Sequence, residues 1–171
     1  MPSAKSVFLQ LDRDLKKAHV RATNKLLKSA DSHAKKQVRE VYNVKLKTLN
    51  KYFAVRKAKL INTTARLTLY RRSIGLLYFG ARETSKGVTV RDRKDRGRKL
   101  IRSGFIRNMK SGHTNIFTRL GKKRLPIAGK YTVGAADMYV AEGLKVFERT
   151  VYADAQKILN QEINFVRGYK K

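Results

Sequence analysis

The sequence predicts an α+β fold, with helices at both ends of the chain and a central antiparallel β-sheet between them. Apolar residues recur at steps of three and four before residue 60 and after residue 135, as on one face of a helix. Between these regions, short runs of alternating or β-branched residues are separated by glycines, as strands are separated by turns. A chain of 171 residues can form one domain with a substantial core, or two very small ones. We expect a single domain over residues 1–171.

The first predicted element is a long N-terminal helix of roughly 35 residues. Alanines occupy the middle of its apolar stripe, which suggests that another element packs closely against it. The basic residues off the stripe are interpreted as a solvated face in preference to a binding face. The stripe consists of Phe8, Leu11, Leu15, Ala18, Ala22, Leu26, Ala30, Ala34, Val38 and Val41. The basic residues off it are Lys16, Lys17, Arg21, Lys25, Lys28, Lys35 and Lys36.

A shorter second helix is predicted over residues 43–58, and it completes a helical region that spans residues 1–60. Thr48 is its expected N-cap, because a threonine hydroxyl can accept a hydrogen bond from the first turn. The expected apolar residues of this helix are Leu49, Tyr52, Phe53 and Val55.

Residues 61–133 form the predicted β region. Leu67 and Leu69 alternate with Arg66 and Thr68, which is the period of a half-buried strand. Two strand-like runs flank residues 110–113, an arrangement typical of a hairpin turn. Residues 91–99, RDRKDRGRK, then form a basic loop between strand-like runs.

Residues 136–166 are predicted to form a C-terminal helix. Gly143 interrupts the pattern, because glycine is a poor helix former. The apolar stripe of this helix consists of Val140, Leu144, Phe147, Val151, Ala155, Leu159 and Ile163.

The charge of the chain is strongly positive. Lysine and arginine number 41 against 12 aspartate and glutamate residues, which gives a formal net charge of +29. The excess is uneven, because residues 131–171 carry six basic and five acidic residues. Such a charge predicts a polyanionic partner, either nucleic acid or an acidic protein surface.

The basic loop is the main candidate for contacting DNA or a partner. Asp92 and Asp95 within it are interpreted as local ion-pair partners in preference to metal ligands. Because the loop contains no apolar residue, we expect its basic side chains to be dispensable for folding. A second basic run follows the predicted hairpin. The candidate contact residues are Arg91, Arg93, Lys94, Arg96, Arg98, Lys99, Lys122, Lys123 and Arg124.

No catalytic, cofactor or metal site is predicted. The chain has no cysteine, and its histidines His19, His33 and His113 lack the spacing of metal ligands. We expect His19 and His33 on helix surfaces and His113 in a turn. No phosphate-binding loop or nucleophile motif is present, so we expect no enzymatic activity. No signal peptide or membrane span is expected either, which indicates a chain used in the cytoplasm or carried within a larger particle.

The segment FIRNMKSGHTNIFTRLGKKRLPI, residues 105–127, resembles the minor tail protein Z family of tailed phages and prophages. The resemblance extends from about residue 18 to about residue 140. The segment AGKYTVGAADMY departs from the family, because members often carry a proline there. The matching residues are Phe105, Ile106, Met109, Ser111, Gly112, His113, Ile116, Phe117, Arg119, Gly121, Lys122, Arg124, Leu125, Pro126 and Ile127.

The resemblance implies a structural virion protein that completes the head-proximal end of the tail tube and helps join tail to head. It implies that copies of the chain form a ring, and six copies are expected from the symmetry of tails. It also implies that the ring is assembled in the host cytoplasm. The implied partners are the tail tube, the tail terminator and the head–tail connector, with non-specific contact to passing DNA. The alternative left open by the residues is a free nucleic-acid-binding protein that acts through phosphate contacts.

Overall fold

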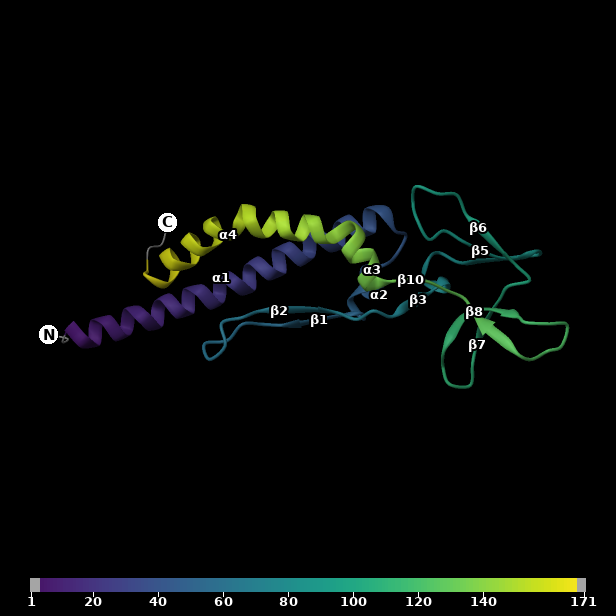
Figure 1. The fold of residues 1–171 in the computed structure, drawn as a ribbon, viewed down its shortest axis with the longest axis horizontal. Coiled ribbons are helices and arrows are strands. Elements are labelled where there is room, and N and C mark those ends of the chain that lie inside the picture. Colours follow the sequence, from purple (N-terminus) through teal and green to yellow (C-terminus); the bar gives the residue numbers. More distant parts are fainter. Residues whose placement is uncertain (1–3, 169–171) are drawn as a thin grey trace. The chain divides into compact units, whose positions relative to one another are not determined.

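The structure is a computed structural model that describes residues 4–168, and it confirms the mixed α+β fold (Figure 1). Its contacts divide the chain into two compact units, each built from segments that are distant in sequence. The first unit combines the described parts of residues 1–34, 54–68 and 144–171. The second unit combines residues 35–53 and 69–143.

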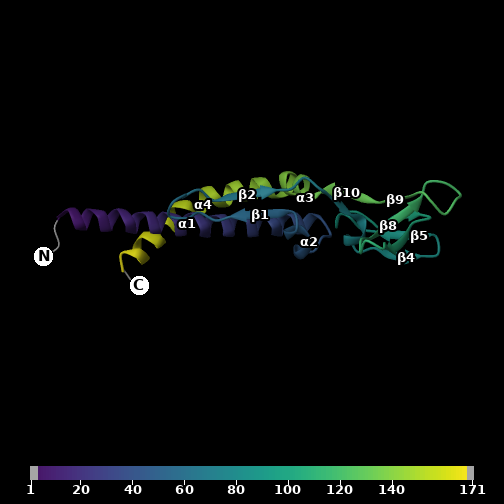
Figure 2. The same cartoon turned by 90° about the horizontal axis from the view of Figure 1, so that it is seen from below.

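The first unit is formed around the long helix α1 (Ala4–Val41) and the C-terminal helix α4 (Leu144–Val166). Figures 1 and 2 show α4 and the paired strands β1 (Phe53–Arg56) and β2 (Arg66–Leu69) running along α1. Asn24 of α1 fixes the chain after β1, because its side chain exchanges hydrogen bonds of 3.0 and 2.8 Å with the Ala58 backbone.

The apolar stripe of α1 is buried from its alanine-rich middle onward. Ala18, Ala22 and Ala30 are buried, as expected of small residues that let another element approach closely. Phe8, Leu11 and Leu15 lie nearer the start of the stripe and are exposed, Phe8 by 70%. The expected stripe is therefore packed only in part within the described residues.

The second unit contains short helices and three small antiparallel sheets. The helices are α2 (Leu46–Asn50), the 3-10 turn η1 (Leu76–Tyr78), α3 (Ala135–Met138) and the π-helical η2 (Tyr139–Gly143). The sheets are β10–β3 (Tyr131–Gly134 and Ser73–Gly75), β4–β5–β6 (Arg82–Thr84, Gly87–Val90 and Lys99–Arg102) and β7–β8–β9 (Phe105–Asn108, Thr114–Arg119 and Ile127–Gly129). The strands of the chain therefore form several small sheets in place of one central sheet.

A core cluster joins two of these sheets. Val88 and Val90 of β5 and Ile116 of β8 are buried to 2% exposure or less. Ile101 and Ile106 pack against them from β6 and β7. Val88 and Val90 are alternate residues of β5, so they point to the same face of that strand, as in sheets that bury one face.

The prediction of a helix over residues 43–58 is wrong in its second half. Helix α2 covers only Leu46–Asn50, and Phe53–Arg56 is strand β1. Thr48 is buried inside α2, while the N-cap position is Lys45, which makes no capping hydrogen bond through its side chain. A short run with aromatic and β-branched residues suits either structure by periodicity, and pairing with β2 selects the strand.

Lys35 departs from the expected solvated face of α1. Its side chain is 7% exposed, and Nζ lies 4.6 Å from the centroid of the Phe53 ring. A lysine can bury its aliphatic stem in this way while its ammonium faces an aromatic ring. By contrast, His19 and His33 lie exposed on α1, as predicted.

The prediction of a helix over residues 136–166 is confirmed. The chain is helical from Ala135 to Val166, and its π-helical segment η2 ends at Gly143, the residue that interrupts the sequence pattern. Among the helices within residues 4–168, none is both long and apolar enough to cross a membrane.

Candidate functional site: the basic loop and the 105–127 hairpin

The basic loop is anchored to the rest of the second unit through its backbone. It connects β5 to β6, and the register pairs Val90 with Lys99, so that Lys99 already belongs to β6. The Asn43 amide donates to the Asp92 carbonyl over 2.9 Å, and the Lys94 amide donates to the Val41 carbonyl over 2.7 Å. The loop is therefore a docked connection, not a free arm.

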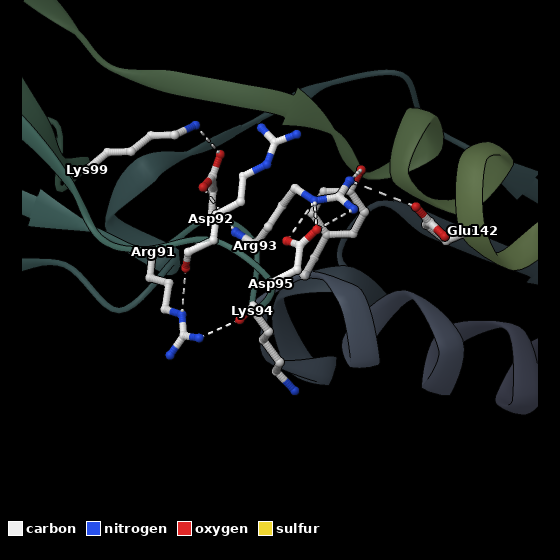
Figure 3. A network of polar contacts seen from close by, with 9 residues as sticks. Arg91, Asp92, Arg93, Lys94, Asp95, Lys99 and Glu142 are labelled. Atoms are coloured by element: carbon white, nitrogen blue, oxygen red, sulfur yellow. Dashed lines mark hydrogen bonds and ion pairs between the residues drawn. The ribbon is translucent and has the colours of Figure 1, made fainter.

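Arg93 is the centre of a polar network within the second unit (Figure 3). It is half-buried, and its Nε donates to the Asp95 carboxylate over 3.0 Å. Its Nη1 lies 3.9 Å from Oε1 of Glu142 in η2, and its Cζ lies 5.2 Å from the centroid of the Tyr42 ring. The hydrogen bond from Arg93 lowers the pKa of the Asp95 carboxyl. Arg93 thus connects the loop to η2 through Glu142 and to Tyr42, the residue that follows α1.

Asp92 forms a second ion pair at the other end of the loop. Its Oδ2 lies 3.1 Å from Nζ of Lys99, and its Oδ1 accepts a 3.0 Å hydrogen bond from the Arg93 amide. Burial raises the pKa of the Asp92 carboxyl, but these hydrogen bonds outweigh burial and hold the pKa below its usual value. The prediction that Asp92 and Asp95 are local ion-pair partners is confirmed.

Two further arginines bind backbone carbonyls. Nε of Arg91 donates to the Arg96 carbonyl over 3.1 Å, and its Nη2 is hydrogen-bonded to the Lys94 carbonyl. Arg98 donates to the Thr89 hydroxyl over 3.2 Å, to the Thr89 carbonyl over 2.8 Å and to the Gly80 carbonyl over 2.6 Å. These contacts give Arg98 a structural role that the composition of the loop did not indicate.

The remaining basic candidates face solvent without such contacts. Within residues 4–168, the side chains of Lys94 and Arg96 are exposed and form no ion pair, and Figure 3 shows Lys94 pointing away from the carboxylates. Lys122, Lys123 and Arg124 are also exposed, in the connection between β8 and β9. The candidates therefore separate into a group that holds the loop in place and a group of free cations. Their contact with DNA or a partner stays a prediction.

The hairpin over residues 105–119 has the predicted turn. Strand β7 pairs with β8 in the register Phe105 to Phe117 and Ile106 to Ile116. Gly112 has a φ of 77° in the turn, a conformation that glycine adopts without steric cost. The Phe105 and Phe117 rings lie 6.3 Å apart on the face opposite Ile106 and Ile116. The hairpin therefore presents two different faces.

Strand β9 extends the hairpin to a third strand. Phe117 pairs with Gly129, and Arg119 pairs with Ile127. The guanidinium carbon of Arg119 lies 5.6 Å from the centroid of the Phe105 ring. Exposed His113 lies in the turn as predicted, with its ring edge-on to Phe117 at 6.4 Å. The residues quoted for the family resemblance thus lie in the three strands of one sheet and in the two connections between them.

The profile of the prophage minor tail protein Z (GPZ) family matches residues 3–166. The chain belongs to this family. Comparison with curated proteins and with solved structures gives no significant match. The family match covers segments of both compact units, so membership rests on nearly the whole chain and not only on residues 105–127. Membership in a family of minor tail proteins supports a structural role in a phage tail.

Two basic residues of the hairpin are absent from the contact candidates predicted from the sequence. Arg107 and Arg119 lie on the same face of the sheet as Phe105, because side chains alternate along β7 and because Arg119 stacks on the Phe105 ring. The period-two pattern of the strands could have placed them there. Across residues 4–168, no three histidine or acidic side chains come together as a metal site would require.

Proposed function

We propose that this chain completes the head-proximal end of a phage tail tube and helps join the tail to the head, without a catalytic role. The observation that carries the proposal is the family match over residues 3–166. In the proposed assembly, copies of the chain form a ring through which DNA passes. Six copies follow from the rotational symmetry expected of a tail. The tail tube, the tail terminator and the head–tail connector are the proposed neighbours.

The charge of the chain supports this setting. With a net charge of +29, the basic side chains of an isolated copy repel one another. Acidic neighbouring proteins or DNA would compensate this charge. The free cations are exposed and can contact either an acidic protein or DNA; they are Lys94, Arg96, Lys122 and Lys123. Contacts to passing DNA would be non-specific, because lysine and arginine bind phosphates whatever the base sequence.

Deletion of the gene from the phage tests this proposal. Electron microscopy of the lysate is expected to show heads and tails that are not joined, and the infectious titre is expected to fall. A plasmid copy of the wild-type gene serves as the control and should restore both. Normally joined, infectious particles from the deletion strain would contradict the proposal.

A free nucleic-acid-binding protein is the second candidate, and the net charge of +29 is the observation that favours it. It predicts that purified monomer binds duplex DNA tightly, with log affinity falling steeply against log salt. The tail proposal predicts oligomers and weak DNA binding. Native mass spectrometry and a salt titration of DNA binding on the same sample distinguish the two candidates.

A further inference from the structure

The sheet β7–β8–β9 buries one face in the core cluster and leaves part of its other face open, although Asn115 and Phe117 of β8 are buried on that second face. Ile106 and Ile116 lie on the face that packs into the core cluster. Phe105, Arg107 and Arg119 lie on the other face, according to the strand register. The alternation of these strands therefore places aromatic and cationic side chains together on an open surface.

This open face forms a pocket that encloses about 400 Å³, a volume within the usual range of ligand sites. Apolar side chains form most of its lining, and one of them, Leu125, is 65% exposed. Three arginines line it as well, and no acidic side chain does. The lining residues are Phe105, Arg107, Met109, Arg119, Arg124, Leu125 and Ile127.

No acidic side chain among residues 4–168 pairs with the arginines of this pocket. Arg119 stacks on the Phe105 ring, which keeps its guanidinium beside the pocket. Arg107 and Arg124 are exposed and make no side-chain hydrogen bond or ion pair to any residue from 4 to 168. A pocket with an apolar lining and uncompensated guanidinium groups favours a ligand that carries both apolar groups and carboxylates.

We propose that this pocket binds an acidic peptide segment of a neighbouring protein, an inference that rests on the proposed role in tail assembly. An apolar side chain of the segment packs against Phe105, Leu125 and Ile127. Carboxylates on either side of it pair with Arg107 and Arg124. Arginine and aromatic residues are the types enriched where protein interfaces concentrate their binding energy.

Other occupants fit less well. A DNA backbone offers phosphates but no apolar side chain, so it would leave the apolar lining uncovered. A second copy of this chain is a poor source of the segment, because the chain carries 12 acidic residues against 41 basic ones. Charge complementarity therefore favours a different, acidic protein.

Fluorescence anisotropy of the purified full chain tests the proposal. The probe is a fluorescein-labelled peptide of alternating aspartate and phenylalanine, eight residues long. The same peptide with asparagine in place of aspartate, an all-aspartate peptide and a short DNA duplex are the comparison probes. We expect the alternating peptide to bind at least about tenfold more tightly than either comparison peptide, since it alone offers both kinds of group.

Two pairs of matched variants locate the binding. Arg107→Gln with Arg124→Gln should weaken binding of the alternating peptide about tenfold, the loss of two partly exposed charge pairs. The control pair, Arg82→Gln with Arg102→Gln, removes the same charge from exposed positions of β4 and β6. It should change the affinity for the alternating peptide less than twofold. Leu125→Ser should weaken binding about fivefold. Leu120→Ser, at a leucine with a similar exposure of 67%, should not.

Several outcomes would overturn the proposal. Equal losses of peptide affinity in the two double-arginine variants would mean that the peptide is attracted by net charge alone. Equal binding of the all-aspartate peptide, or no effect of Leu125→Ser, would remove the apolar anchor. Loss of DNA binding without loss of peptide binding in the pocket pair would make this a phosphate site. Each of these results leaves the gene-deletion test untouched, so failure of the pocket and failure of the tail role are separate observations.

Discussion

Oε2 of Glu162 in α4 lies 2.5 Å from Nε of Arg21 in α1. Lys25, one turn further along α1, pairs with the other carboxylate oxygen. Glu162 is only 1% exposed, whereas the side chains of Arg21 and Lys25 are 46% and 60% exposed. The Arg21 guanidinium also lies 4.2 Å from the centroid of the Phe165 ring. One buried acid therefore joins the two long helices of the first unit.

Glu162→Gln is expected to lower the free energy of unfolding of the first unit by about 1–3 kcal/mol at pH 7, because it removes two charge-assisted hydrogen bonds. Burial raises the pKa of the Glu162 carboxyl, but hydrogen bonds from Lys25 and Arg21 outweigh burial and hold the pKa below its ordinary value. A lowered folded-state pKa stabilises the fold above the unfolded pKa, and this stabilisation is lost as the pH falls through the folded pKa. The free energies of unfolding of the wild type and of Glu162→Gln should therefore become similar at acidic pH.

Urea unfolding followed by the helical circular dichroism signal, at pH 7 and at pH 3, measures this difference. Glu148→Gln is the control, since Glu148 lies exposed on the same helix. A difference from wild type that stays the same at both pH values would contradict the assigned role of the charge.

Arg98→Ser is expected to destabilise the second unit by about 1–2 kcal/mol, because three hydrogen bonds to Gly80 and Thr89 are lost. Lys94→Ser is the matched change, in the same loop and with the same loss of charge, and it should stay within about 0.5 kcal/mol of wild type. Thermal unfolding of the two variants in parallel measures both effects. Equal stabilities would show that Arg98 does not hold the loop in place.

The long helices could be predicted from the sequence because their apolar periodicity persists over many turns. The segment 43–58 could not, because its apolar run is short and the conformation of its second half depends on pairing with β2, which lies outside the segment. The basic loop could be located by its charge. Which of its arginines bind back to the protein depends on where Gly80, Thr89 and Tyr42 lie in the fold, and sequence spacing does not contain that information.

Gly87→Ala is expected to destabilise the sheet β4–β5–β6 by about 2–4 kcal/mol. Gly87 has a φ of 137°, and a Cβ there would lie 2.2 Å from the Ile101 carbonyl oxygen of the paired strand. Gly97→Ala in the basic loop is the control, because a Cβ there would meet nothing within 4 Å and its φ lies outside the left-handed region. It should be neutral or stabilising by up to about 1 kcal/mol, since alanine restricts the unfolded chain. Denaturant midpoints compare the two, and similar losses would contradict this assignment.

The free cations offer a test of which surface meets DNA. Replacing Lys94, Arg96, Lys122 and Lys123 with glutamine should reduce the slope of log affinity against log salt by about 0.9 for each phosphate contact that is lost. The control variant removes the same charge by replacing four exposed lysines of α1 and α4 with glutamine. These are Lys28, Lys36, Lys145 and Lys157. If the slope falls equally in both variants, DNA binding depends only on the net charge of the chain. A fall confined to the first variant, together with unjoined heads when that variant replaces the wild-type gene, would assign DNA contact to these two loops.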